Sequence, residues 1–328
     1  MAVMQSGIVA LVADIGGTYA RFALADISTM EIREYRKYKV SECESLEAAV
    51  TRYLASVARR PARACFAIAG PVGGDVIRLT NANWSFTRAG LRDATGAEVV
   101  VFANDYEALA HSLPYLTGGE MCKIGSGTAE AQATKAAVGP GTGLGVAALY
   151  WSESGWSAIS GEGGHISFAA ENAEEFEILN RLRHDVGHVS AERLISGPGL
   201  SQTYAILGEM SGRAPEKLGA AEIVERARNG TDPVAIKTVG LFAEWLGRFA
   251  GDAALMFGAR GGVYVAGGVA PRILDVLIAG RFRLGFESKG RMTDYMKRIP
   301  THVILIDDAG LRGAAAMLMA ADEDRTGA

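Results

Sequence analysis

The first third of the chain alternates short apolar segments with polar turns. Residues 8–14 form an apolar run that ends in an aspartate, residues 19–26 partly alternate, and residues 31–40 can supply a third strand. Residues 62–69 and 98–105 are two further short apolar segments. The pattern predicts an α/β unit whose strands end at polar residues.

Helical spacing appears between and after these strands. Ser45 has the character of an N-cap for a helix that ends near Arg60, before Pro61. Further along, the spacing predicts a loop at 117–128, a strand at 302–307 and several helices, at 173–186, 191–195, 233–257 and 311–321.

The beginning of the chain and its middle share one pattern of strand, glycine turn and strand. Residues 135–138 lead into the glycine-rich run 139–145, and an apolar segment, 146–151, follows it. A third apolar strand and glycine turn lies at 262–268. The repetition indicates two related half-folds, each offering a glycine hairpin to a shared cleft.

The length of the chain favours two domains. A chain of 328 residues exceeds what a single hydrophobic core usually organises, and its 49% hydrophobic and 21% charged residues are typical of a folded enzyme. We expect a small α/β domain from residues 1–110 that the C-terminal residues 308–328 complete, and a large α/β domain from residues 111–307.

Charge and cysteine content narrow the classes of partner. The net charge is -4 and no dense Lys/Arg block occurs, so we expect no nucleic-acid partner. The three cysteines Cys43, Cys65 and Cys122 are far apart, as in a reduced cytoplasmic protein. No uncharged apolar stretch approaches the roughly 20 residues of a membrane helix, and we expect no membrane association.

The glycine turns are candidates for holding phosphate. A dinucleotide fingerprint would need a helix directly after Gly141 and Gly143, where a β-like run follows, and the absence of any Gly-Lys pair excludes a P-loop. Glycines between paired strands permit close backbone approach and positive φ, so several N–H groups can point at phosphate oxygens. A plain tight hairpin is the alternative for each turn taken alone.

These motifs, in this order, resemble those of a known superfamily. Residues 14–18, 139–145 and 265–268 are similar to the two phosphate motifs and the adenosine motif of the hexokinase, heat-shock protein and actin superfamily. Within it, the segments 103–105, 161–165, 190–193 and 196–199 resemble the bacterial glucokinases that lack a zinc site. The resemblance implies a two-domain actin-like ATPase fold, ribonuclease H-like, with an interdomain cleft.

The resemblance also implies roles for individual residues. It makes Asp105 the base that accepts the proton of the sugar 6-hydroxyl, and it gives Asp14 a role at Mg²⁺, directly or through water. The glucose-binding residues it implies are Asn104, Asp105, Glu162, His165 and Glu192. The ATP-binding residues it implies are Ala13, Asp14, Ile15, Gly16, Gly17, Thr18, Gly141, Thr142, Gly143, Gly267 and Gly268.

The activity implied is transfer of the γ-phosphate of ATP to the 6-hydroxyl of glucose, the first step of glycolysis, by a cytoplasmic homodimer that uses ATP and Mg²⁺. Two alternatives stay open. Hydroxyl-binding side chains do not specify an epimer, so another hexose or an N-acetylhexosamine is possible as substrate. The same fold also occurs in actin-like ATPases and sugar sensors that phosphorylate no sugar.

Overall fold

The computed structural model describes residues 9–57, 59–79, 84–214 and 216–326. Backbone contacts divide the chain into two compact units, and each is described by itself. Unit 1 comprises Met1–Thr117, Trp156–Ser160 and Ile306–Ala328, and unit 2 comprises Gly118–Gly155 and Gly161–Leu305. The domain limits expected from the sequence stay a prediction, and Ile8, the first residue of the first expected strand, lies outside the described residues.

Unit 1 contains a five-stranded sheet of order β3-β2-β1-β4-β7. The strands are β1 Val9–Ile15, β2 Tyr19–Asp26, β3 Glu31–Lys39, β4 Arg63–Ile68 and β7 Val99–Asn104. β1 and β2 form an antiparallel hairpin, and β4 runs parallel to β1, as β7 does to β4. The five expected strands are therefore confirmed, to within about two residues at each end. A separate two-stranded sheet pairs β5 Val76–Arg78 with β6 Ser85–Thr87.

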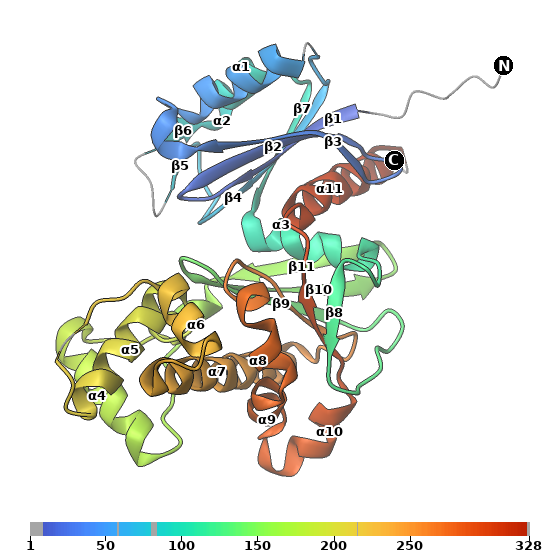
Figure 1. Cartoon of the computed structure of the whole chain (residues 1–328). Helices are drawn as coiled ribbons and strands as arrows, with labels where there is room; N and C mark the ends of the chain where they lie inside the picture. Colours follow the sequence, from blue (N-terminus) through green and yellow to red (C-terminus); the bar gives the residue numbers. More distant parts are fainter. Residues whose placement is uncertain (1–8, 58, 80–83, 215, 327–328) are drawn as a thin grey trace. The chain divides into compact units, whose positions relative to one another are not determined.

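Helices cover both faces of the five-stranded sheet (Figure 1). Alternate residues of β1 point to opposite faces, so Leu11 and Ala13 pack with α1, whereas Ala10 and Val12 pack with α11. The helices of unit 1 are α1 Leu46–Val57, α2 Arg88–Thr95, α3 Asp105–Ser112 and α11 Ala309–Thr326. By the same alternation Asp14, two residues after Val12, lies on the face that α11 covers.

α11 also packs very closely on α3. A Cβ placed on Gly313 would lie 1.6 Å from the carbonyl oxygen of Ala108, so only glycine permits this approach between the two helices. The last helix of the chain therefore fixes α3, whose first residue is Asp105.

Unit 2 is built on a six-stranded sheet of order β11-β10-β9-β12-β13-β8. The strands are β8 Met121–Ile124, β9 Lys135–Pro140, β10 Leu144–Ser152, β11 Gly155–Gly161, β12 Val263–Val265 and β13 Thr301–Ile304. The expectation of a loop over residues 117–128 is wrong, because β8 forms there and pairs antiparallel with β13. A strand of four residues at a sheet edge gives too short an alternation to be recognised.

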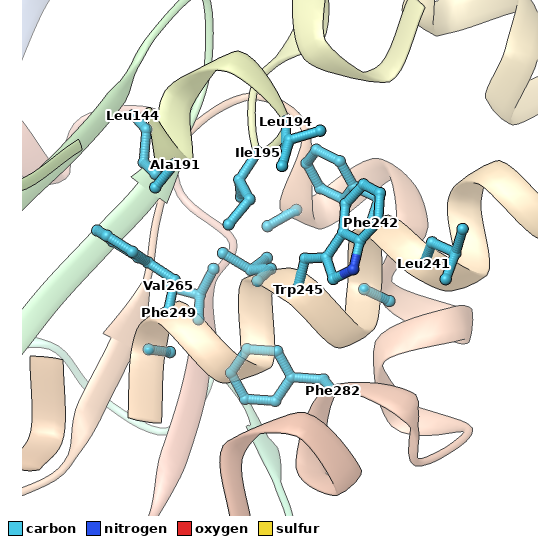
Figure 2. Close-up of a cluster of buried hydrophobic side chains, with 14 of the residues drawn as sticks. Leu144, Ala191, Leu194, Ile195, Leu241, Phe242, Trp245, Phe249, Val265 and Phe282 are labelled. Carbon is cyan, nitrogen blue, oxygen red and sulfur yellow. The ribbon is translucent and has the colours of Figure 1, made fainter. Parts of the chain in front are cut away.

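The helices of unit 2 pack around the long central helix α7, Pro233–Phe257 (Figure 1). The others are α4 Ala173–Val186, α5 Gly197–Met210, α6 Ala220–Arg228, α8 Leu274–Ile278, α9 Arg281–Glu287 and α10 Thr293–Arg298. Figure 2 shows the core they share with the sheet, where Phe242, Trp245 and Phe249 of α7 meet Val265 of β12 and Phe282 of α9.

The expected helix at residues 191–195 is a single 3₁₀ turn, Ala191–Arg193. The amides of Arg193 and Leu194 donate to the carbonyls three residues earlier, at 3.1 Å each. The turn cannot continue as a helix, because the backbone of Ser196 has a β conformation. The Ser196 hydroxyl accepts from the Gly199 amide and so caps the next helix.

Asp232 ties α5 to the start of α7. Its Oδ2 accepts from the Tyr204 hydroxyl at 2.7 Å, and its Oδ1 accepts from Arg213 at 2.7 Å and from the Val234 amide at 2.9 Å. Burial alone would raise the pKa of Asp232, but the hydrogen bonds from Tyr204, Arg213 and the backbone lower it to about 2.

Within the described residues, no helix combines the length and the apolar character that crossing a membrane requires.

Asp232→Asn should lower the free energy of unfolding near neutral pH. A carboxyl whose pKa is about 2 when folded and near ~3.9 when unfolded contributes stability above pH ~4, and that contribution of about 2 kcal/mol disappears as the pH falls towards 2. Thermal melts across this range should show the variant and the wild type converging at the acid end. Asp294→Asn, at a side chain 92% exposed, is the control. A constant difference at every pH would contradict this role for the charge.

Candidate active site

The parallel strands of unit 1 bring polar residues to one edge of the sheet. Ile15 of β1 is level with Ile68 of β4, and Ile68 is level with Asn104 of β7. Because the carboxyl ends of parallel strands meet at one edge, Asp14 and Asn104 belong to the same edge, which is where open α/β sheets commonly bind ligands.

The Asp14 side chain lies beside the Arg21 guanidinium and the start of α11. Arg21, its partner across the β1–β2 hairpin, donates to Asp14 Oδ2 at 3.0 Å. A Cβ placed on Gly310, in the first turn of α11, would lie 3.6 Å from the Asp14 Cγ atom. Burial raises the pKa of Asp14, and the charge and hydrogen bond of Arg21 oppose that effect. Neither Arg21 nor Gly310 was among the site residues expected from the sequence.

The turn after Asp14 is a short hairpin connection. The Gly16 amide donates to the Tyr19 carbonyl at 3.0 Å, and the Thr18 carbonyl accepts from the Val40 amide, also at 3.0 Å. The predicted ATP-binding residues Ala13, Ile15, Gly16, Gly17 and Thr18 therefore lie on this hairpin, with Ala13 and Ile15 fully buried.

Asn104 caps α3. Its Oδ1 accepts from the amides of Tyr106 and Glu107, at 2.9 and 3.3 Å, and the Glu107 side chain accepts from the Asn104 amide at 3.3 Å. Its Nδ2 donates to the Gly70 carbonyl at 3.3 Å. This capping box was not expected from the sequence, although Asn104-x-x-Glu107 is its usual signature. In this structure the Asn104 side chain orients the helix that begins at Asp105.

Asp105 and Asp14 share a neighbour. Burial raises the pKa of the Tyr106 hydroxyl, and the carboxylates of Asp105 and Asp14 raise it further. The Tyr106 phenol therefore stays protonated at neutral pH, and the charges of both carboxylates are close enough to affect its pKa. Asp105 Oδ1 accepts from the Tyr106 amide at 3.0 Å, and its side chain is half-buried.

In unit 2, the second glycine turn closes the β9–β10 hairpin. Leu144 pairs with Pro140, so Gly141, Thr142 and Gly143 form the loop, and the Gly141 amide donates to the Gly143 carbonyl at 2.8 Å. Within the described residues, the amides of Thr142 and Gly143 make no hydrogen bond. Two N–H groups at the tip of the turn are thus left to donate to a ligand.

Of the two properties expected of the glycines in this turn, close approach and positive φ, the structure shows only close approach. Neither Gly141 nor Gly143 has a positive φ. A Cβ on Gly143 would lie 2.5 Å from Glu192 Oε2, whereas a Cβ on Gly141 would meet nothing within 4 Å and would only fill the approach to the turn.

The third glycine turn lies beneath the second. β12 runs parallel to β9, and the Ala266 amide donates to the Val138 carbonyl at 2.8 Å. Gly267 has φ +83, and a Cβ there would lie 2.4 Å from the Pro140 carbonyl oxygen. At Gly268, the neighbouring residue, an added Cβ would meet nothing within 4 Å. Position 267 thus requires glycine for two reasons: its backbone has a positive φ, and it lies in close contact with the second turn.

Of the predicted sugar residues of unit 2, Glu192 contacts the first residue of β10. Gly164 packs on the Leu144 carbonyl, and Glu192 Oε2 accepts from the Leu144 amide at 2.8 Å. Glu162 precedes and His165 ends the 3₁₀ turn Gly163–His165, and both side chains are exposed. The structure therefore brings Glu192 and the backbone of residues 163–165 to the second glycine turn.

A further contact to this turn was not foreseen. The Gly197 amide, at the start of α5, donates to the Gly141 carbonyl at 2.8 Å. The Ser-Gly-Pro-Gly segment at 196–199, used in the sequence analysis only as a mark of resemblance, thus holds the turn from its other end.

His184 and His188, which are spaced four apart in the chain, contact different neighbours. His188 Nε2 lies 3.0 Å from the His165 carbonyl oxygen, and His184 Nδ1 lies 3.4 Å from the neighbouring Asp185. Across the described residues, no group of three or more His, Cys, Asp or Glu side chains could hold a metal ion by itself.

Gly267→Ala should destabilise the protein by about 1–3 kcal/mol, because alanine would be strained at this φ and would press on Pro140. Gly268→Ala is the matched control, and we expect its thermal melt to lie close to that of the wild type. Equal melting temperatures for the two variants would contradict the packing of the third turn on the second.

Comparison with known proteins gives one family. The glucokinase family model matches residues 11–321. A glucokinase from Cronobacter sakazakii is 41% identical over 309 residues, covering 94% of this chain and 96% of that protein. The crystal structure of a glucokinase from an Antarctic psychrotroph is similar with a TM-score of 0.84 and 37% identity, over 95% of this chain and 99% of that one.

More distant structures share the fold. A ROK family glucokinase from Streptomyces griseus, solved in complex with glucose and AMPPNP, has a TM-score of 0.65 and 20% identity, over 94% of this chain and 98% of that one. The predictions of an actin-like ATPase fold and of a glucokinase-type transferase are confirmed by these matches. The chain belongs to the glucokinase family.

Proposed function

We propose that this chain transfers the γ-phosphate of ATP to the 6-hydroxyl of D-glucose, giving glucose 6-phosphate and ADP. The observation that carries the proposal is the arrangement around Leu144. The amides of Thr142 and Gly143 are left to donate, and Glu192 of the predicted sugar set accepts from the amide of Leu144, the residue that follows the turn. A phosphate-binding turn that directly adjoins polar sugar-binding groups suits a sugar kinase.

Asp105 is the proposed general base. It is the first residue of α3, placed there by the Asn104 capping box and by the packing of α11 on α3. A carboxylate at this position can accept the proton of the 6-hydroxyl as that oxygen attacks the γ-phosphorus. Positioning dominates in a loose phosphoryl-transfer transition state, so a base of ordinary strength is sufficient.

Glucose hydroxyls both donate and accept hydrogen bonds, so carboxylates, an amide and an imidazole are suitable partners. Asn104, Asp105, Glu162, His165 and Glu192 are the proposed set. The Asn104 side chain already caps α3 and donates to the Gly70 carbonyl, so we assign it a positioning role. It can contact the sugar only through hydrogen-bonding capacity that these bonds do not use.

ATP would be held by the hairpin turn at residues 13–18, by Gly141, Thr142 and Gly143, and by Gly267 and Gly268. The chain's donor set fits Mg²⁺ held mainly by phosphates and water, with Asp14 as its carboxylate, directly or through water. When bound, the ion would offset charge on the phosphates. Arg21, which pairs with Asp14, orients that carboxylate.

We propose that the chain acts as a cytoplasmic homodimer at the first step of glycolysis, as its resemblance to the bacterial glucokinases implies. Light scattering after gel filtration tests the assembly, and a monomer at micromolar concentration would contradict it.

The proposed activity requires that release of ADP depend on glucose. In a coupled assay with Mg-ATP, Asp105→Asn should lower turnover by about 10²-fold or more, the lower range for loss of a general base. The amide keeps an acceptor oxygen, so glucose binding without nucleotide should change by no more than ~1 kcal/mol. ADP release that is equal with and without glucose in the wild type would rule out a sugar kinase.

Asp93→Asn is the matched control. Asp93 is exposed on α2, in the same unit, and its loss should leave turnover near wild type. Thermal melts of both variants separate catalysis from folding. A folded Asp105→Asn variant within tenfold of wild-type turnover would show that Asp105 is not the base.

A further inference from the structure

Glu192 lies beside the second glycine turn. Its carboxylate is half-buried, and Oε2 accepts from the Leu144 amide at 2.8 Å. The amides left to donate, those of Thr142 and Gly143, directly precede Leu144 in the turn. A negative charge is therefore held beside the N–H groups to which phosphate would bind.

The position of Glu192 is fixed by packing. Figure 2 shows the side chains of Leu144 and Ala191 next to each other, to the left of Ile195 and Leu194 in the core of unit 2. Ala191 is 1% exposed and Leu144 is 5% exposed, and the Ala191 amide donates to the Ile166 carbonyl at 2.9 Å. This packing fixes the backbone from which the Glu192 side chain reaches the Leu144 amide.

The turn and the carboxylate are also in close contact at Gly143. A Cβ there would lie 2.5 Å from Glu192 Oε2, which is closer than real Cβ contacts allow. The other carboxylate oxygen, Oε1, makes no hydrogen bond to the described residues. One oxygen thus holds the turn, while the other can accept from a ligand hydroxyl.

We propose that Glu192 couples sugar binding to nucleotide binding within unit 2. Without sugar, its full charge beside the turn opposes the phosphates of the nucleotide. A sugar hydroxyl that donates to Oε1 withdraws part of that charge and fixes the carboxylate, and the turn then accepts phosphate more readily. This inference rests on the proposed function, since it takes glucose and ATP as the two ligands.

Coupling of this kind is reciprocal, because each ligand must change the affinity of the other by the same factor. We expect glucose to tighten the binding of Mg-AMPPNP by about 5-fold or more in the wild type, within the usual range for coupled sites. Calorimetric titration of the full chain measures it in both directions: AMPPNP with and without saturating glucose, and glucose with and without AMPPNP.

Glu192→Gln is the decisive variant. It removes the charge and keeps an acceptor oxygen for the Leu144 amide, so we expect AMPPNP to bind at least as tightly as in the wild type when glucose is absent. The coupling factor should fall to within about twofold of one. Gly143→Ala acts on the same contact from the other side, because its methyl group would displace Oε2, and it should also lower the coupling factor.

Glu162→Gln is the matched control, since it removes a carboxylate from the predicted sugar set at an exposed position outside the turn. The Glu162→Gln change should weaken glucose binding and leave the coupling factor unchanged. A Glu192→Gln variant that couples like the wild type overturns the proposal, as does a wild type that binds both ligands without coupling. A wild type that fails to bind glucose at all would reject the proposed function and the inference with it.

Discussion

A hairpin flanked by a parallel strand is the constraint on which both units depend. In unit 1, β4 runs parallel to β1 of the β1–β2 hairpin, and in unit 2, β12 runs parallel to β9 of the β9–β10 hairpin. In each unit the hairpin turn and the end of the parallel strand therefore lie at one sheet edge. Both hairpin turns contain glycines, and turns of this kind suit a ligand held by backbone N–H groups.

In unit 2 the hairpin turn is fixed by its surroundings more than by its own residues. The Gly197 amide holds the Gly141 carbonyl, Glu192 holds the Leu144 amide, and Gly267 packs against Pro140. These contacts come from two segments of the chain, residues 192–197 and Gly267, both remote from the turn in the sequence. Beneath them lies the α7 core, so the geometry of the turn is set by a large, well-packed hydrophobic cluster (Figure 2).

Much of this could be predicted from the sequence, because apolar periodicity and glycine placement are local signals. The strands of unit 1 and the two hairpins follow from them. The strand β8 could not be foreseen, since four residues carry too little pattern and their partner β13 is remote in the chain. Asn104 as a helix cap could have been, since Glu107 follows at the usual spacing.

The site residues stay a prediction, and the structure adds physical reasons for some of these positions that the sequence could not give. Glycine at 143 permits close approach to a carboxylate from a segment that lies far along the chain, and glycine at 313 permits contact between two helices. Arg21 and Gly310 reach Asp14 only through strand pairing and through the packing of α11. Such contacts depend on the tertiary structure and leave no pattern in neighbouring residues.

The claim that the second glycine turn binds phosphate can be tested at its own amides. In the ¹⁵N-labelled full chain, Mg-AMPPNP should shift the amide resonances of Thr142 and Gly143, which have no partner among the described residues. Glucose alone should shift the Leu144 amide, which donates to Glu192. Resonances of Thr142 and Gly143 that stay unchanged at saturating AMPPNP would contradict the account.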